Sequence, residues 1–231
     1  MATATTSKAG AHGQRFVLYD IGWEGYQTLL RIMGERPVRV TYDRGNVELM
    51  TTSPIHEIYK HLLGRMVDTI GEELDIPMFG QGSTTINRED VDRGLEPDEC
   101  YYIANAGRVA DRSQLNLETD PPPDLAIEIE ITRNVLDRLG IYAALGVPEV
   151  WRFDGEALRV LLLGADGTYS PSESSAAFPF LPMKEMTRFL REYDRNNDTR
   201  WGREFRTWVR NEIGPRFHPS RIRSVMPTRN N

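Results

Sequence analysis

The stretch Asp124-Leu-Ala-Ile-Glu128-Ile-Glu130-Ile-Thr132 decides the fold, because its residues alternate with the period of a β-strand. Its side chains divide between two faces: Leu125, Ile127, Ile129 and Ile131 on one, and Asp124, Ala126, Glu128 and Glu130 on the other. The first face is suited to a hydrophobic core. The second brings carboxylates together, and buried carboxylates are costly unless they are paired or bound to a metal. This one strand therefore predicts both a core and a candidate site.

A second strand is expected over residues 99–103, directly after Glu96-Pro97-Asp98. Pro97 has no backbone N–H, so it is expected at the start of that strand. If the two strands are neighbours, Asp98 can join Glu128, and two carboxylates form an oxygen site for a divalent metal. Acidic residues on a strand are more often simply solvated, and two carboxylates are a weaker signature than a Cys/His zinc spacing. The residues alone leave both interpretations open.

Hydrophobic periodicity predicts the other elements. Helices are expected over residues 21–33, 54–74, 135–145, 184–193 and 201–211, and strands over 38–42, 47–51, 83–88, 149–154 and 156–163. We expect Asp20 to cap the first helix, Ser53 the second, and Thr132 or Asn134 the third. Residues 89–94 and 164–182 are expected to be loops, and residues 104–120 a long loop or a broken helix. This order predicts an α/β (α+β) fold with a mixed sheet flanked by helices.

Length and composition suggest one domain. The chain has 231 residues, of which 39% are hydrophobic and 27% are charged. We expect a single domain over residues 15–212, between a flexible N-terminal tail (1–14) and a flexible basic C-terminal tail (213–231). No run approaches the roughly 18 apolar residues of a membrane span, and the N-terminus lacks the apolar segment of a signal peptide. The expected location is therefore the cytoplasm.

Charge and cysteine content exclude some functions. The net charge of −6 argues against a general nucleic-acid coat protein, although a local basic groove remains compatible with it. The single cysteine, Cys100, excludes an intramolecular disulfide and a Cys-rich zinc site. The four histidines, His12, His56, His61 and His218, are too scattered to favour zinc binding or histidine-based catalysis.

Four segments resemble a known family. EPDECYYI (96–103), PPPDLAIEIEIT (121–132), LDRLGIYAALGVPEVWRFDGEAL (136–158) and AFPFLP (177–182) are similar to the Uma2 family of endonuclease-like proteins. The resemblance extends over roughly residues 16–210. It implies the PD-(D/E)XK restriction-endonuclease-like fold, in which an acidic residue on one strand and an acidic-x-Lys pair on the next hold Mg²⁺ and activate water. Asp98 matches the first acid, Glu128 matches the second, and the carbonyl of Ile129 is the implied third metal ligand.

The chain departs from this pattern at the basic residue. The Lys position two residues after Glu128 is Glu130 here. Uma2 relatives usually carry the basic group on the next helix, four residues before a Tyr, and here Arg138 precedes Tyr142 by that spacing. Arginine can stabilise charge, but it stays protonated and is a poor proton shuttle. The alternative role for Arg138 is a structural pair with a carboxylate.

Two weaker candidates lie on other helices. Glu57, on the first long helix, is a candidate for reaching the metal site, and a surface pair with Lys60 or His61 is the alternative. Arg203, Arg206 and Arg210 share one side of the last helix. Such a row can contact phosphates, although a solvated face is the more common explanation.

These residues support three functions. The first is a metal-dependent endonuclease that uses Mg²⁺ or Mn²⁺ to hydrolyse phosphodiester bonds of DNA. The second is a catalytically weak or inactive nuclease-fold protein that binds nucleic acid or a protein partner. The third is a structural homodimer without a catalytic site. A homodimer is expected under all three, because cleavage of two strands favours two sites.

Overall fold

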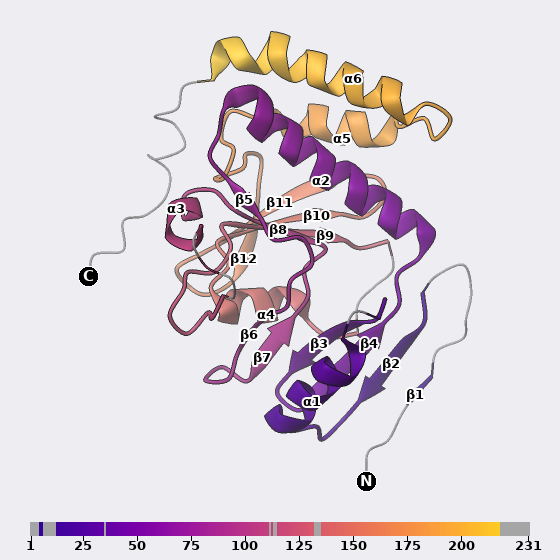
Figure 1. Ribbon diagram of the computed structural model, residues 1–231, viewed down its shortest axis with the longest axis vertical. Coiled ribbons are helices and arrows are strands. Elements are labelled where there is room, and N and C mark those ends of the chain that lie inside the picture. The colour runs from indigo at the N-terminus through magenta and orange to yellow at the C-terminus, as the bar shows by residue number, and fades with distance from the viewer. Residues whose placement is uncertain are drawn as a thin grey trace.

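The computed structural model describes residues 5–6, 13–34, 36–110, 112, 115–131 and 135–217. Within these residues the chain forms six α-helices and two six-stranded β-sheets (Figure 1). The predicted mixed α/β class is confirmed, with two sheets rather than one. No helix in the described residues is long and apolar enough to cross a membrane.

The larger core is built on the second sheet, whose strand order is β12-β11-β10-β9-β8-β5. The strands are β5 (Phe79–Gly80), β8 (Glu99–Tyr102), β9 (Leu125–Ile129), β10 (Glu149–Phe153), β11 (Leu158–Leu163) and β12 (Tyr169–Ser172). The sheet is mixed, since β9 and β10 are parallel and every other pair is antiparallel. Every residue of β9 is buried, and Leu125, Ile127 and Ile129 enter the main core as the alternation predicted.

Helices cover both faces of this sheet (Figure 1). The six helices of the chain's described residues are α1 (Trp23–Met33), which packs on the first sheet, α2 (Pro54–Leu74), α3 (Ala106–Val109), α4 (Arg138–Leu145), α5 (Met183–Arg191) and α6 (Asp198–Trp208). Side chains of α2, α5 and α6 pack with Ile127 and Trp151 in one continuous core. On the opposite face, Ile141 and Leu145 of α4 pack against Ala126 and Val150.

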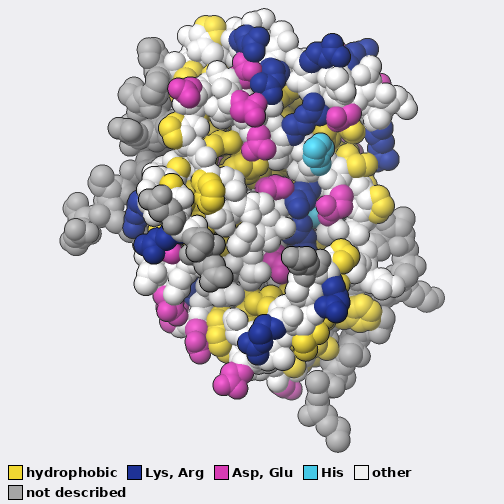
Figure 2. All heavy atoms as spheres, viewed as in Figure 1, with side chains coloured by type: hydrophobic (Ala, Val, Ile, Leu, Met, Phe, Trp, Pro, Cys, Tyr) yellow, Lys and Arg dark blue, Asp and Glu magenta, His cyan; other side chains and the backbone are white. Residues whose placement is uncertain are grey.

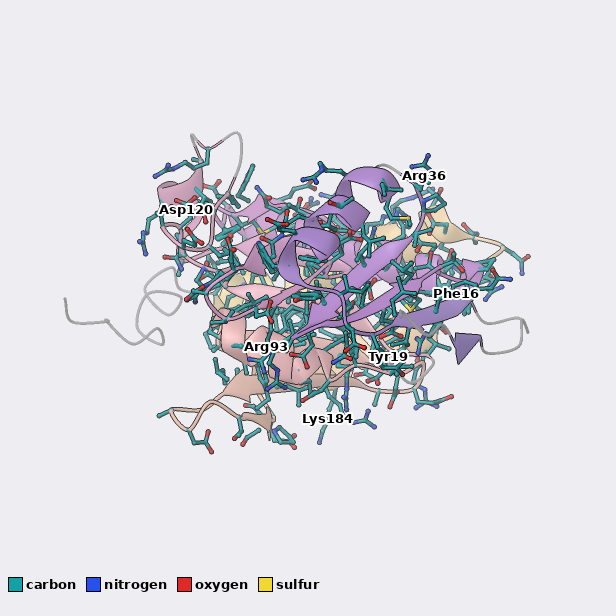
Figure 3. All side chains as sticks on the ribbon, turned by 90° about the horizontal axis from the view of Figure 1, so that it is seen from below. Phe16, Tyr19, Arg36, Arg93, Asp120 and Lys184 are labelled. Atoms are coloured by element: carbon teal, nitrogen blue, oxygen red, sulfur yellow. The ribbon has the colours of Figure 1, made fainter. Side chains whose placement is uncertain are left out.

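The first sheet has the order β1-β2-β4-β3-β7-β6 and carries α1. Its strands are β1 (Thr5–Thr6), β2 (Arg15–Leu18), β3 (Arg39–Asp43), β4 (Asn46–Met50), β6 (Ile86–Arg88) and β7 (Arg93–Leu95). Phe16 of β2 and Arg93 of β7 lie toward opposite ends of this sheet in the view from below (Figure 3). Ile86 and Leu95 pack with the α4 side chains. Helix α4 therefore joins the two sheets, and the candidate site lies beside it.

Several predicted boundaries were wrong. Helix α1 follows Gly22 instead of an Asp20 cap, and Asp20 has a positive φ of 59°. Helix α4 starts later than predicted, at Arg138, and the carboxylate of Asp137 accepts a hydrogen bond from Gly140 N at 3.1 Å. The caps that the sequence predicted for this helix, Thr132 or Asn134, lie outside the described residues. Helix α6 starts before the predicted residue 201, because the Asn197 side chain caps it by accepting from Arg200 N.

Two strands occupy predicted loops. Strand β7 pairs with β3 and β6, and a Cβ at its Gly94 would overlap the Tyr26 hydroxyl, so tertiary packing places this short strand. Strand β12 pairs with β11 at the sheet edge, where its Pro171 is tolerated. Beyond α6 the chain continues through a π-helical turn, Val209–Ile213, and a 3₁₀ turn, Gly214–Arg216. The rest of the predicted C-terminal tail, and most of the predicted N-terminal tail, lie outside the described residues.

Candidate functional site

Asp98 and Glu128 lie on neighbouring strands. Strand β8 pairs antiparallel with β9, with Glu99 opposite Ile127. The backbone continues this ladder, since Asp98 N donates to Ile127 O at 3.1 Å. The Asp98 side chain in turn accepts a hydrogen bond from Ile129 N at 2.6 Å. The condition set by the sequence, that the two strands are neighbours, therefore holds, and it brings Asp98 next to Glu128 and Ile129.

Arg138 binds Glu128 through two parallel hydrogen bonds. Its Nε lies 3.0 Å from Glu128 Oε2, and its Nη2 lies 2.5 Å from Oε1. The Tyr142 hydroxyl, one turn further along α4, donates to the same Oε1. Arg138 also donates to Thr41 Oγ1 at 2.6 Å and to the carbonyl of Glu96 at 2.7 Å. Arg138 therefore connects α4 to both sheets.

Asp98 has its own cationic partner, Arg39 of β3. Arg39 Nη2 lies 3.0 Å from Asp98 Oδ1, and Nη1 donates to the carbonyl of Pro97 at 2.6 Å. His56 of α2 also contacts Asp98, with Nε2 at 3.1 Å from the carboxylate. Burial opposes ionisation of Asp98, but His56, Arg39 and the Ile129 N–H together lower its pKa below the ordinary value.

Neither Arg39 nor His56 was predicted as a site residue. The signal for Arg39 was present in the strand alternation, because Arg39 and Thr41 share a face while Val40 points into the small core under α1. The signal for His56 was its place in the first turn of a helix capped by Ser53, whose Oγ accepts from His56 N. Neither signal reveals the partner across the fold, so these residues could be placed only by the structure.

Charge in the cluster is balanced pair by pair. Asp98 pairs with Arg39, and Glu128 pairs with Arg138. Beside them, Arg15 Nε of β2 lies 3.6 Å from Glu48 Oε1 of β4. Asp98, Glu128 and Arg138 are each at most 7% exposed. Burial alone would lower the pKa of Arg138, but the Glu128 carboxylate raises it well above the ordinary value, so the guanidinium keeps its proton. Burial also raises the pKa of Glu128, and the nearby Asp98 charge adds to this effect.

The donor set matches a magnesium site in kind. Two carboxylates and a backbone carbonyl are hard oxygen ligands, and Mg²⁺ in enzymes is usually held by one or two carboxylates with waters and substrate phosphates. The described residues contain no group of three or more His, Cys, Asp or Glu side chains able to hold a metal ion. Both carboxylates here also bind arginine, so an ion would share them with Arg39 and Arg138.

The remaining predicted residues lie outside this cluster. Glu130 forms an ion pair with Arg152 of β10, in which Arg152 Nη1 lies 3.1 Å from Glu130 Oε2. Arg138 pairs with Glu128 instead. The Glu57 side chain is 49% exposed and contacts His56 Nδ1 at 3.3 Å, instead of Lys60 or His61. It therefore reaches Asp98 only through His56.

The basic side of α6 is partly neutralised. Arg206 pairs with Glu72 at 2.8 Å and with Glu73 at 2.7 Å, and Arg210 pairs with Glu73 at 2.9 Å. Arg203 is exposed on the outer surface of the same helix. Figure 2 shows acidic and basic side chains interspersed on the viewed face, without a broad patch of one sign. Helix α6 also lies across the second sheet from α4, away from Glu128 (Figure 1).

The fold and this cluster define a mixed α/β protein with a pair of buried carboxylates on adjacent strands. The family model for Uma2, described as "Putative restriction endonuclease", matches residues 23–191 of the 231-residue chain. The chain therefore belongs to the Uma2 family. No curated protein matches it.

Proposed function

We propose that this protein is a metal-dependent endonuclease with a restriction-endonuclease-like PD-(D/E)XK core, which hydrolyses phosphodiester bonds of DNA. The observation that carries the proposal is the hydrogen bond from Ile129 N to Asp98. It links the carboxylate before β8 to the strand that carries Glu128, within a chain of the Uma2 family. Asp98, Glu128 and the carbonyl of Ile129 would hold Mg²⁺ or Mn²⁺. The ion would supply a water of lowered pKa and stabilise charge on the phosphate.

The protein's own groups then have distinct tasks. Arg39 and His56 fix the orientation of Asp98, and Tyr142 and Arg138 fix that of Glu128. Arg138 cannot accept a proton at neutral pH, so its contribution to hydrolysis is positive charge near the phosphate. A homodimer would place two such sites on one duplex, and light scattering measures that state directly.

Calorimetric titration with Mn²⁺ tests the metal site without a choice of DNA substrate. We expect saturable binding near one site per chain in the wild type and its loss in Glu128→Gln. Glu149→Gln is the matched control, because Glu149 is another buried glutamate of the same sheet, 1% exposed, and it contacts Trp151 rather than the cluster. Equal Mn²⁺ binding by the wild type and Glu128→Gln would remove the proposed metal role of Glu128.

A second function is favoured by the arginine pairs. Asp98 and Glu128 are each neutralised by a buried guanidinium, and neither forms an ion pair with a lysine among the described residues. This arrangement suits a nuclease-fold protein that binds nucleic acid or a protein partner without cleaving DNA. If that is its function, Asp98→Asn and Glu128→Gln retain the DNA affinity of the wild type, and supercoiled plasmid stays intact with Mg²⁺ or Mn²⁺. Metal-dependent nicking that both substitutions abolish would exclude this alternative.

A further inference from the structure

A polar cavity of about 340 Å³ lies on the same side of the second sheet as the carboxylate pair. Cys100 and Tyr102 of β8 line it, and alternation puts both on the face that carries Asp98. The other walls come from the start of α1, the segment 81–89 and the segment 115–118. None of the functions argued above uses this cavity.

The lining is rich in uncharged hydrogen-bonding groups. Gln27, Gln81 and Asn87 contribute side-chain amides, and Trp23 contributes an aromatic ring. Within the described part of the chain, the amide groups of Gln27 and Gln81 make no hydrogen bond to protein. A side-chain amide presents a donor and an acceptor side by side, which is the pattern that pairs with the edge of a nucleobase. Aromatic rings stack on bases.

The charge of the cavity excludes an anion as its main ligand. Glu89 and Glu118 line it, and the one cation, Arg88, is already bound to Asp90, with Nε 2.9 Å from Oδ1. A phosphate would therefore meet net negative charge. The volume lies at the lower end of the roughly 300–1,000 Å³ found for small-ligand pockets. These features fit a neutral, planar heterocycle better than a phosphate, a peptide or a lipid.

The cavity also adjoins the carboxylate cluster. Cys100 is two residues from Asp98 along the chain, a separation of about 7 Å in an extended strand. Thr85, in the cavity wall, donates to the Glu96 carboxylate at 3.3 Å, and the Glu96 carbonyl accepts from Arg138. A base bound in the cavity therefore lies next to the segment that carries Glu96 and Asp98.

We propose that this cavity binds one unpaired nucleobase of a DNA strand, whose phosphate then lies at the Asp98–Glu128 cluster. The inference rests on the proposed function, because that function supplies DNA as the ligand. Enzymes that take a base out of a duplex read it through hydrogen bonds to its edge and stacking on aromatic side chains. The binding step makes and breaks no covalent bond, so it can be measured without hydrolysis.

The test is binding of a fluorescein-labelled single-stranded oligonucleotide, measured by anisotropy in EDTA. We expect Gln27→Leu and Gln81→Leu to weaken binding roughly tenfold each, the effect of losing a good amide–base pair. Gln14→Leu is the matched control, because Gln14 is an exposed glutamine outside the cavity. An oligonucleotide series with abasic sites gives a second measurement on the wild type. Removing bases from the oligonucleotide should weaken its binding to the wild type to a similar extent. This measurement does not depend on whether the variants fold.

The outcomes separate this inference from the proposed function. Equal binding by the wild type and both cavity variants, with cleavage of plasmid by Mn²⁺, overturns the cavity proposal and leaves the nuclease proposal intact. If the cavity variants bind more weakly and the wild type does not cleave plasmid, the cavity proposal is supported and the proposed endonuclease function is overturned. Binding of deoxynucleoside monophosphates but of no oligonucleotide identifies a free nucleotide as the ligand and overturns the strand proposal. A protein that binds none of these probes overturns the cavity proposal, and plasmid cleavage with Mn²⁺ then decides the nuclease proposal by itself.

Discussion

The contacts of Arg138 explain why its replacement should have two separate consequences. It supplies two hydrogen bonds to Glu128, one to Thr41 and one to the Glu96 carbonyl. A lysine is a compact point charge with no planar fork, so it cannot make these contacts together. The same lysine is, however, better able to move a proton.

We therefore predict that Arg138→Lys loses stability and gains nuclease activity. The free energy of unfolding should fall by about 1–3 kcal/mol, because buried hydrogen-bonding groups are left unpaired. Metal-dependent plasmid cleavage should rise, because a proton-transferring group is restored. Chemical denaturation and a plasmid assay measure the two effects.

Arg200→Lys is the matched control, because Arg200 forms only an exposed pair with Glu204. Its stability should remain within about 0.5 kcal/mol of the wild type. If Arg138→Lys unfolds less readily than the wild type, the structural role assigned to Arg138 is wrong. If its cleavage rate does not rise, the missing lysine does not limit activity.

The sequence predicted the members of this cluster that lie within one local pattern. Asp98 and Glu128 follow from two strands whose alternation is visible in consecutive residues. The Uma2 resemblance implied Arg138, and helical spacing puts Tyr142 on the same face of the helix. Arg39 could not be predicted as a partner of Asp98. It comes from the other sheet, and the two residues meet because β3 pairs with β7, which leads through Glu96 and Pro97 directly into Asp98.

At the scale of elements, the contact between α2 and α6 combines an apolar core with a charged edge. Phe205 packs in the main core, and Glu73 accepts from both Arg206 and Arg210. The two arginines lower the pKa of Glu73 through their hydrogen bonds, which outweigh the effect of burial. The arginines of these pairs are exposed, although the Glu73 side chain is only 10% exposed, so salt can still screen the pairs and their contribution to stability is small.

Glu73→Gln should therefore change the stability of the fold only slightly. It should have a larger effect on the positive charge of Arg206 and Arg210, which lose the Glu73 carboxylate as a partner. We expect a slightly lower melting temperature at low salt and no difference in about 1 M salt, where screening is nearly complete. If Arg206 and Arg210 contact DNA, freeing Arg210 and loosening Arg206, which keeps its pair with Glu72, should raise affinity and steepen its salt dependence. Thermal unfolding and anisotropy at several salt concentrations measure both effects.

Glu185→Gln provides the control, since it breaks an exposed pair with Arg188 on α5 and leaves Arg206 and Arg210 in place. Equal DNA affinity in the wild type, Glu73→Gln and Glu185→Gln would show that α6 is only a solvated basic face.

Elements with strong periodicity were predicted well, and elements made by pairing were not. Helix α2 extends over Pro54–Leu74, as its apolar stripe and Ser53 cap predicted. Strands β7 and β12 contain Gly94 and Pro171, which weaken local strand propensity. They form because β3 and β11 offer unpaired edges. Sequence periodicity does not contain that information.

At the scale of the whole molecule, carboxylates with opposite pKa shifts make stability depend on pH in two separate windows. Burial raises the pKa of Glu149 above its ordinary value of 4.5, despite hydrogen bonds from Ser175, Ala177 and Trp151. Burial also opposes ionisation of Asp154, but the N–H groups of Ala157 and Glu156, with Arg159, lower its pKa to about 2. The signs of the two contributions follow from linkage.

Glu149 binds its proton more readily in the folded state, so it should stabilise the protein as the pH falls from neutral toward 4.5. Asp154 binds its proton less readily in the folded state than at its ordinary value of 3.8. Its contribution is therefore present above pH 3.8 and is lost as the pH falls toward about 2. Chemical denaturation at a series of pH values gives the free energy of unfolding that both effects change.

Comparison with neutral variants isolates each contribution, because all other titrating groups are shared. The stability of the wild type relative to Glu149→Gln should rise as the pH falls toward 4.5. The stability relative to Asp154→Asn should stay constant above 3.8 and decline below it. Asparagine keeps an oxygen that accepts from the Glu156 and Ala157 N–H groups, so the second comparison reports mainly the charge. If the stability difference between the wild type and Glu149→Gln does not change with pH, burial does not destabilise the ionised Glu149. The loss of stability at acidic pH would then depend on Asp154 and carboxylates like it.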